Sequence, residues 1–193
     1  MSTSPRLLAF AGSTRKDSYN KKLVRIAANA ARSAGADVEF LDLKNFPLPL
    51  FDEDLEKESG IPENAQKLKK LFIAADGFLI SSPEYNSSIS GVLKNTIDWI
   101  SRPVPGEAPL AGFMGKSAVL MSASPGALGG LRGLVAVRSI LDNIGVLVLP
   151  DQIAVAKAFE AFNDDGSLKD AVQQASVEKL GTKLAAVAGK LKA

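Results

Sequence analysis

Short apolar runs alternate along the chain with longer stretches of helical periodicity. Five runs bounded by Gly, Ser or Pro predict buried strands: Leu7 to Ala11, Val38 to Leu43, Gly77 to Ser81, Ala118 to Met121 and Val146 to Leu149. Helical patterns lie between them, and this alternation is typical of β-α-β units around a parallel sheet. The pattern therefore predicts an α/β fold in one domain, residues 1–193, with a five-stranded parallel sheet and helices on both faces.

Two segments depart from simple alternation. The helix predicted from about Ser90 to Ser101 has a wide apolar arc, and the simpler interpretation is a helix well buried within one chain. Trp99, at the edge of that arc, would equally suit contact with a partner chain. The segment from Asn45 to Gly60 contains two prolines and an acidic run, and it is predicted to be a long connection.

The amino-acid composition excludes several kinds of functional site. The 193 residues include no cysteine and no histidine, which excludes disulfides, Cys/His zinc sites and His-activated nucleophiles. Any redox chemistry then requires a bound cofactor. The 23 Lys and Arg against 21 Asp and Glu leave a net charge of +2, without an arginine-rich run for nucleic acid.

Targeting features are also missing from the sequence. No apolar stretch approaches the roughly 20 residues of a bilayer span, and Met1 to Pro5 is polar, unlike the apolar core of a secretory signal. We expect a cytoplasmic protein with no membrane span, no nucleic-acid partner and no metal ion.

A polar loop, residues 12–20, follows the first predicted strand and leads into the first helix. A phosphate monoester there would meet backbone N–H groups, hydroxyl groups, an amide and the Arg15 charge. The simpler interpretation is that Ser13 and Ser18 only cap the helix, although capping accounts for one serine and not for the whole loop. The dinucleotide fingerprint G-x-G-x-x-G is absent, which favours a terminal phosphate, as in FMN, over a pyrophosphate.

Two further loops follow later strands. Residues 81–88 include Pro83, which restricts the backbone and suits the ordered N–H and C=O groups that a flat ring requires. Residues 122–130 include three glycines, which permit close approach of a ligand. If each loop is considered by itself, the simpler interpretation of residues 81–88 is a plain proline turn, and that of residues 122–130 is a flexible connection. Because the carboxyl ends of parallel strands share one edge, we expect the three loops to lie together.

Four motifs in order carry a resemblance over nearly the whole chain: GSTRKDSYN, PEYN, LKNTIDW and SPGALGG. With them the chain resembles the NADPH-dependent FMN reductase family, in the branch of chromate, quinone and azo-dye reductases. The resemblance implies a flavodoxin-like fold and non-covalently bound FMN. The residues that it implies are Ser13, Arg15, Ser18 and Asn20 for the phosphate, Pro83, Glu84, Tyr85 and Asn86 for the isoalloxazine ring, and Ser124, Gly126, Gly129 and Gly130 for the loop that closes on the flavin.

The resemblance also implies a reaction and an assembly. NADPH or NADH would reduce the flavin, and a flavin, quinone, azo compound or metal oxyanion such as chromate would then take its place in a ping-pong mechanism. Arg102 resembles a family arginine that would attract an anionic substrate or the nicotinamide cofactor. No side chain is expected to be catalytic, and Glu84 is expected to be a solvated carboxylate. Since the family commonly forms dimers or tetramers, we expect a homodimer or homotetramer.

Two other functions fit the sequence less closely. One is a flavodoxin-type electron carrier that serves protein partners, although such carriers are usually strongly acidic and this chain is near neutral. The other is an α/β interaction module that binds no flavin.

Overall fold

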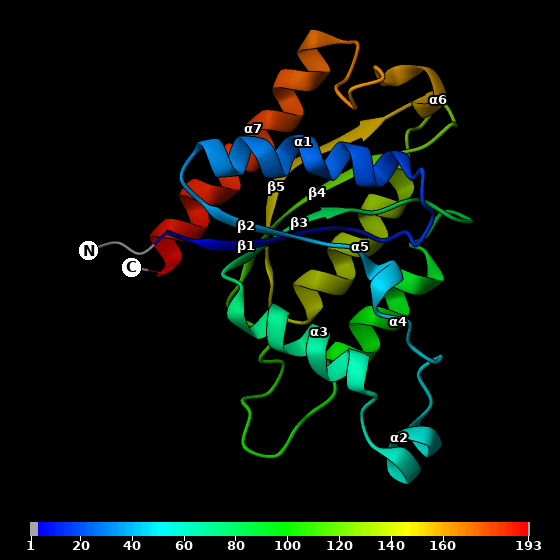
Figure 1. Cartoon of the computed structure of the whole chain (residues 1–193), viewed down its shortest axis with the longest axis vertical. Coiled ribbons are helices and arrows are strands. Elements are labelled where there is room, and N and C mark those ends of the chain that lie inside the picture. The colour runs from blue at the N-terminus through cyan, green and yellow to red at the C-terminus, as the bar shows by residue number, and fades with distance from the viewer. Residues whose placement is uncertain (1–3, 193) are drawn as a thin grey trace.

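The computed structural model describes residues 4–192, so that part of the polar start Met1 to Pro5 lies outside the described residues. Five parallel strands form one sheet (Figure 1). They are β1 (Arg6–Ala11), β2 (Asp37–Leu41), β3 (Gly77–Ser81), β4 (Ser117–Ala123) and β5 (Leu147–Val155), in the order β2-β1-β3-β4-β5. This is the order of flavodoxin-like sheets, which bind ligands beyond the carboxyl ends of the strands. The predicted fold class is confirmed.

Helices cover both faces of the sheet. In residues 4–192 they are α1 (Tyr19–Ser33), α2 (Glu53–Ser59), α3 (Glu63–Ala74), α4 (Gly91–Ile100), α5 (Leu131–Asn143), α6 (Ala158–Ala161), α7 (Ala171–Lys192) and the 3-10 helix η1 (Leu43–Asn45). α1 and α7 pack on one face, and α3, α4 and α5 pack on the other (Figure 1). Successive side chains of β4 alternate between the two cores, with Val119 on the α1 side and Leu120 on the α5 side. No helix in this part of the chain is long and apolar enough to cross a bilayer.

Three strands end at different residues from those predicted, and of these β4 runs two residues past Met121 to Ala123. β5 continues past Pro150 to Val155, because the register shifts between Ala118 and Leu120 and leaves an irregularity opposite the proline. Proline is tolerated there because β5 is an edge strand and needs no N–H at a bulge. β2 ends at Leu41 because the Asp42 carboxylate accepts a hydrogen bond from the Lys44 N–H (3.0 Å) and starts η1.

The predicted connection from Asn45 to Gly60 contains a helix that the apolar pattern did not indicate. Asp52 caps α2 by accepting a hydrogen bond from the Asp54 N–H (2.8 Å), and acidic residues in the first turn suit the helix dipole. None of the α2 residues is buried, so the helix has no apolar periodicity to detect.

Trp99 lies inside this chain. Its indole N–H donates to the Pro49 carbonyl (2.9 Å), and the Phe51 ring meets it edge-on at 5.0 Å between centroids. Its exposed fraction is 0%. The interpretation of Trp99 as a contact with a partner chain is therefore wrong, because residues of the preceding connection cover the outer side of α4.

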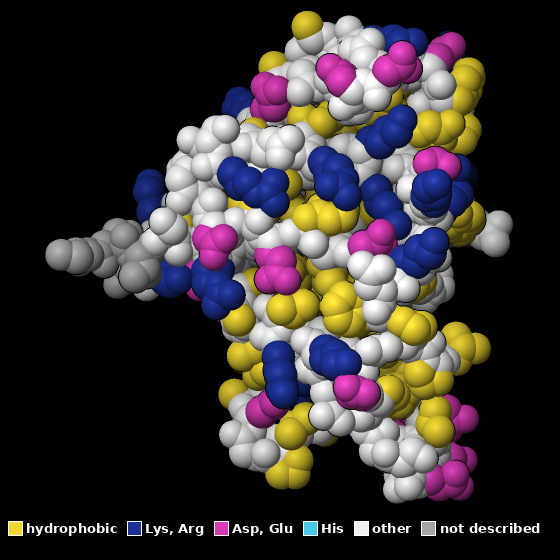
Figure 2. All heavy atoms as spheres, in the orientation of Figure 1, with side chains coloured by type: hydrophobic (Ala, Val, Ile, Leu, Met, Phe, Trp, Pro, Cys, Tyr) yellow, Lys and Arg dark blue, Asp and Glu magenta, His cyan; other side chains and the backbone are white. Residues whose placement is uncertain are grey.

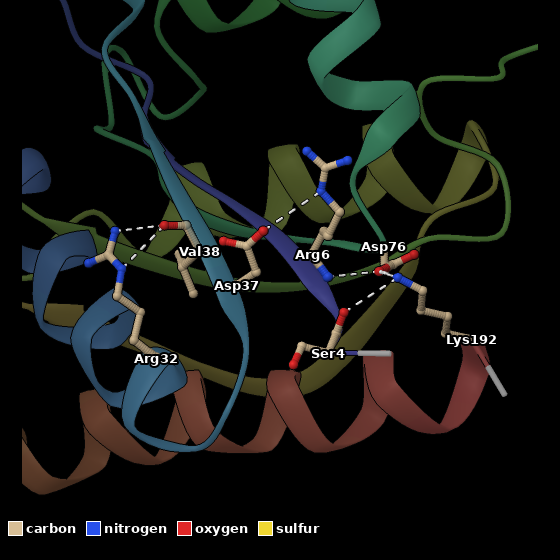
Figure 3. Close-up of polar contacts among 7 residues, drawn as sticks. All are labelled: Ser4, Arg6, Arg32, Asp37, Val38, Asp76 and Lys192. Carbon is tan, nitrogen blue, oxygen red and sulfur yellow. Dashed lines mark hydrogen bonds and ion pairs between the residues drawn. The ribbon is translucent and has the colours of Figure 1, made fainter. Parts of the chain in front are cut away.

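The two ends of the described chain meet at the amino edge of the sheet (Figure 3). The Asp76 carboxylate accepts hydrogen bonds from the Arg6 backbone N–H (2.7 Å) and from the Lys192 ammonium (2.9 Å). Lys192 also donates to the Ser4 carbonyl (3.4 Å). One carboxylate thus fastens the first strand and the last helix on the side opposite the three predicted loops.

The backbone of α7 lies directly against that of α1. A Cβ atom on Gly181 would overlap the carbonyl oxygen of Ala27 in α1. Because Gly181 has no side chain, the two helices can lie this close together. Their close contact in turn fixes the position of α1 and of its amino end.

We predict opposite effects for two Gly→Ala substitutions in α7. Alanine usually stabilises a helix interior by about 0.5–1 kcal/mol relative to glycine. Gly181→Ala should instead lower the free energy of unfolding by about 1–3 kcal/mol, because the new methyl group forces the helices apart. Gly189→Ala is the control, since its nearest neighbouring atom would be Pro5 Cγ at 3.8 Å, and it should be neutral or stabilising. Urea unfolding of both variants measures the difference, and equal effects would contradict the close-contact interpretation.

Candidate functional site

The three predicted loops enclose a cavity of about 370 Å³ at the carboxyl edge of the sheet. Its lining comes from the β1–α1 loop (Ser13, Arg15, Ser18, Tyr19, Asn20), the β3–α4 loop (Pro83, Glu84, Tyr85) and the β4–α5 loop (Ala123, Ser124, Pro125). Eight of the predicted binding residues are therefore brought together, whereas Asn86, Gly126, Gly129, Gly130 and Arg102 are not in the lining. A larger hollow of about 870 Å³ between α1 and α7 contains none of the predicted residues.

Asn20 fastens the first loop to two strands. Its side-chain oxygen accepts hydrogen bonds from the Ser81 hydroxyl (2.8 Å) and the Ala123 N–H (3.0 Å), and its amide donates to the Ala123 carbonyl (2.8 Å). The side chain is buried. Asn20 therefore contributes to the site chiefly by holding the start of α1 against the ends of β3 and β4.

Ser18 occupies the N-cap position of α1 without capping it through its side chain. The Ser18 carbonyl accepts the first helical hydrogen bond, from the Lys22 N–H at 3.2 Å, but the hydroxyl makes no cap hydrogen bond. The N–H groups of Tyr19 and Asn20, at the first two helical positions, have no intrahelical acceptor by helix geometry. The interpretation of Ser18 as a simple side-chain cap is therefore wrong, and its hydroxyl remains available to a ligand in the cavity.

The charge around this loop favours an anion. α1 has basic residues but no acidic residue in its sequence, and its dipole adds positive potential at the amino end. Figure 2 shows Lys and Arg side chains gathered over α1, whereas Asp and Glu side chains gather at the tip formed by α2. Arg15 lies over the Tyr19 ring, with 5.2 Å between the guanidinium carbon and the ring centroid.

The β3–α4 loop ends in a tight turn. Asn86 and Ser87 both have positive φ angles, of 50° and 63°, and Tyr85 and Ser88 exchange two backbone hydrogen bonds of 3.0 Å. This is the geometry of a type I′ turn. It leaves the Tyr85 side chain 61% exposed at the cavity mouth, and it places Asn86 at the tip of the turn, outside the lining.

The Glu84 carboxylate is not solvated, in contrast to our expectation. It accepts hydrogen bonds from Arg132 Nε (2.9 Å) and from the Gly133 N–H (3.1 Å), and the side chain is only 9% exposed. Burial raises the pKa of Glu84, but the hydrogen bonds from Gly133 and Arg132 outweigh this effect and hold the pKa below its ordinary value. Glu84 thus fastens its loop to the amino end of α5.

The glycines of the β4–α5 loop have different roles. A Cβ atom on Gly129 would lie 2.7 Å from the Ala156 nitrogen, and one on Gly130 would overlap the Ser122 hydroxyl. Both have positive φ, so packing within the chain accounts for these two glycines. A Cβ atom on Gly126 would meet nothing nearer than Ser124 Oγ at 3.7 Å. Gly126 therefore has room for a side chain, although its N–H already donates to Ser124 Oγ (3.3 Å).

Arg102 lies away from the cavity. α4 spans ten residues, Gly91–Ile100, which carries the chain about 15 Å from the loops. There the Arg102 Nε pairs with the Glu56 carboxylate (2.9 Å) and the guanidinium lies over the Phe51 ring at 5.0 Å. Within one chain, Arg102 holds α2 beside a second cavity of about 460 Å³ lined partly by Glu56.

The residues present fit the phosphate of FMN. They combine a free hydroxyl at a helix N-terminus, two uncommitted helical N–H groups and the Arg15 guanidinium. Glu84, the carboxylate in the lining, is already paired with Arg132. Sequence reasoning missed Tyr19 as a lining residue, although an aromatic residue beside Ser18 at the start of the helix could have indicated it.

Known proteins that are similar to this chain include an FMN reductase and quinone reductases. Residues 5–160 match the family described as NADPH-dependent FMN reductase. An NAD(P)H-dependent FMN reductase of Pseudomonas aeruginosa is 34% identical over 171 residues, which cover 88% of each chain. A quinone reductase of Escherichia coli K12 is 36% identical over 150 residues, which cover 77% of this chain and 76% of the relative.

A solved structure shares the whole architecture. It is a flavoenzyme NAD(P)H:(acceptor) oxidoreductase from Paracoccus denitrificans, with a TM-score of 0.79 and 28% identity, and the match covers 97% of this chain and 98% of that one.

We predict that Glu84→Gln destabilises the protein in a pH-dependent way. A carboxyl with a lowered folded-state pKa contributes stability above its unfolded value of about 4.5, and the contribution is lost as the pH falls through the folded pKa. The variant should therefore lose about 1 kcal/mol of unfolding free energy at pH 7, and the difference should shrink toward pH 3.5. Chemical unfolding at both pH values measures it. Glu160→Gln, at an exposed ion pair, is the control, and a difference that grows on acidification would contradict the assignment.

Proposed function

The chain belongs to the NADPH-dependent FMN reductase family, and from that membership we propose that it passes electrons from NADPH or NADH, by way of bound FMN, to quinones and similar small, flat acceptors. The observation that carries the proposal is the Ser18 hydroxyl, which lies at the amino end of α1 without a capping bond and lines the cavity together with Arg15. We propose that residues 1–193 act as one FMN-binding domain.

Each loop has a distinct part in this proposal. The hydroxyls of Ser13 and Ser18 and the Arg15 guanidinium hold the phosphate, and Asn20 fixes the helix that presents them. Pro83 and Tyr85 would hold the isoalloxazine ring. The backbone around Ser124 and Gly126 closes on it from the β4–α5 loop.

The chain's own residues bind and orient, while the cofactor supplies the redox chemistry. When bound, FMN accepts a hydride from a reduced nicotinamide and delivers electrons to an acceptor. Glu84 is held by Arg132, so no lining carboxylate is free to move a proton. Because both substrates exchange electrons with the same bound cofactor, we propose that they occupy one position in turn, which gives ping-pong kinetics.

Quinones are our preferred acceptors because several relatives of 34–36% identity are named quinone reductases, including those of Solanum tuberosum and Escherichia coli. Family membership favours a reductase over the flavodoxin-type electron carrier. We propose the cytoplasm as its location, since reduced nicotinamide nucleotides are produced there.

We also propose that the active form is a homodimer or a larger homo-oligomer. Exposed apolar side chains lie on the first turns of α5, among them Leu131 (44% exposed) and Val135 (65% exposed), one turn apart. Tyr85 and Leu128 are also more than half exposed. Apolar side chains grouped in this way are typical of surfaces that a partner covers.

Ser18→Ala should weaken FMN binding by about tenfold to a hundredfold. The reason is the loss of one hydrogen bond to a charged phosphate, worth about 1.5–3 kcal/mol. Quenching of FMN fluorescence measures the affinity, and oxidation of NADPH by benzoquinone should fall in proportion when FMN is subsaturating. Ser33→Ala, at the other end of α1, is the control. Unchanged FMN affinity in Ser18→Ala would overturn the phosphate assignment, and a wild-type protein that oxidises no NADPH would overturn the proposed function.

Val135→Glu should dissociate the assembly, because a buried unpaired carboxylate is costly at an apolar contact. Sedimentation velocity of the variant should give the mass of one chain, whereas the wild type should give a multiple of it. Val172→Glu is the control, since Val172 is 76% exposed on α7. A wild-type protein that sediments as one chain at all concentrations would contradict the assembly.

A further inference from the structure

Two aromatic rings and two cations form a stacked row beside the cavity. The Tyr19 and Phe162 rings are nearly parallel, with an interplanar angle of 7° and 6.0 Å between centroids. The Arg15 guanidinium lies 5.2 Å from the Tyr19 centroid, and the Lys22 ammonium lies 5.7 Å from the Phe162 centroid. We call these four residues the cation–aromatic row. Tyr19 and Arg15 belong to the cavity lining, whereas Phe162 is not among the lining residues.

The row holds its cations without neutralising them. Among residues 4–192, neither Arg15 nor Lys22 forms an ion pair with a carboxylate. By contrast, Arg102 is held by Glu56, and its charge is cancelled there. An aromatic face attracts a cation through its quadrupole and restricts its position, but it carries no net charge. The full positive charge of Arg15 therefore remains available to an anion.

Phe162 is itself fixed by the third loop of the site. It follows α6 directly, and the Ala158 N–H of that helix donates to the Ser124 carbonyl (3.1 Å). On its other side, Phe162 pairs with Leu168 in an isolated bridge. Phe162 also packs against the core under α1. The Tyr19 ring thus has a firm support that comes from a distant part of the chain.

We propose that Phe162 is a positioning residue for phosphate recognition, because it supports Tyr19 and Tyr19 in turn holds Arg15 at the phosphate loop. This inference rests on the proposed function, since it takes the phosphate of FMN as the ligand of Arg15. It adds a residue that lies outside the family match, which ends at residue 160. It also predicts that Phe162 acts on the phosphate end of the ligand and not on its ring.

The test compares two ligands that differ by the phosphate. Phe162→Leu should weaken binding of FMN by about two- to fivefold, the range of an exposed cation–π contact, and should leave binding of riboflavin unchanged. Combining Phe162→Leu with Arg15→Ala should weaken FMN binding no further than Arg15→Ala alone, because Phe162 acts on the phosphate only through Arg15. Phe162→Tyr keeps an aromatic ring at this position and should therefore bind FMN with the wild-type affinity.

Controls separate this role from a general effect on the fold. Phe159→Leu, on the exposed side of α6, should leave both affinities unchanged, and thermal unfolding of each variant checks that it folds. Phe162→Met keeps an apolar side chain without a ring and replaces Phe162→Leu if that variant does not fold.

The outcomes are distinct. A wild-type protein that binds no FMN overturns the proposed function and this inference with it. If the wild type binds FMN, equal loss of FMN and riboflavin affinity in Phe162→Leu overturns the inference alone and shows a merely structural role. Unchanged FMN affinity also overturns it.

Discussion

The buried carboxamide of Asn20 joins the first helix to the carboxyl ends of two strands, and the geometry of the site depends on it. It accepts a hydrogen bond from the Ser81 hydroxyl in β3 and pairs with both the N–H and the carbonyl of Ala123 in β4. Loss of this side chain would leave buried groups on both strands without partners, which costs more than the bond itself contributes. Because Ser18 is only two residues away, the position of the β1–α1 loop relative to the other two loops follows from this contact.

Some polar groups around the cavity are hydrogen-bonded or ion-paired within the chain, and others are not. Asn20 and Glu84 are used, and so is Ser90, whose hydroxyl donates to the Gly12 carbonyl (2.6 Å) while it caps α4. The Ser18 hydroxyl is not used as a cap, and Arg15 is placed by an aromatic ring and not by a carboxylate. A hydroxyl and a cation left in this state beside a helix N-terminus are suited to bind an anion, whereas the groups of a well-packed turn are already paired.

The sheet and its loops could be predicted from the sequence because their signals are local. Central parallel strands are buried on both faces and appear as unbroken apolar runs, and the loops that follow them meet at one edge whatever the helices do. The features that the sequence did not predict depend on contacts between residues that are far apart in the chain. Glu84 is held by Arg132, 48 residues later, and Trp99 is covered by Pro49, 50 residues earlier. Likewise, Gly129 must be a glycine because the backbone at the end of β5 leaves no room for a Cβ atom. A glycine in a loop sequence does not by itself show whether packing or ligand binding requires it.

The two hydrogen bonds that Lys192 donates, to the Asp76 carboxylate and to the Ser4 carbonyl, have a practical consequence (Figure 3). Since the first and last described residues meet on the face away from the cavity, a short peptide could join them and the chain could be reopened elsewhere as a circular permutant. A surface loop such as residues 163–167 would then supply the new ends. For the same reason, a label or an electrode linker attached near either residue would leave the ligand edge facing solution.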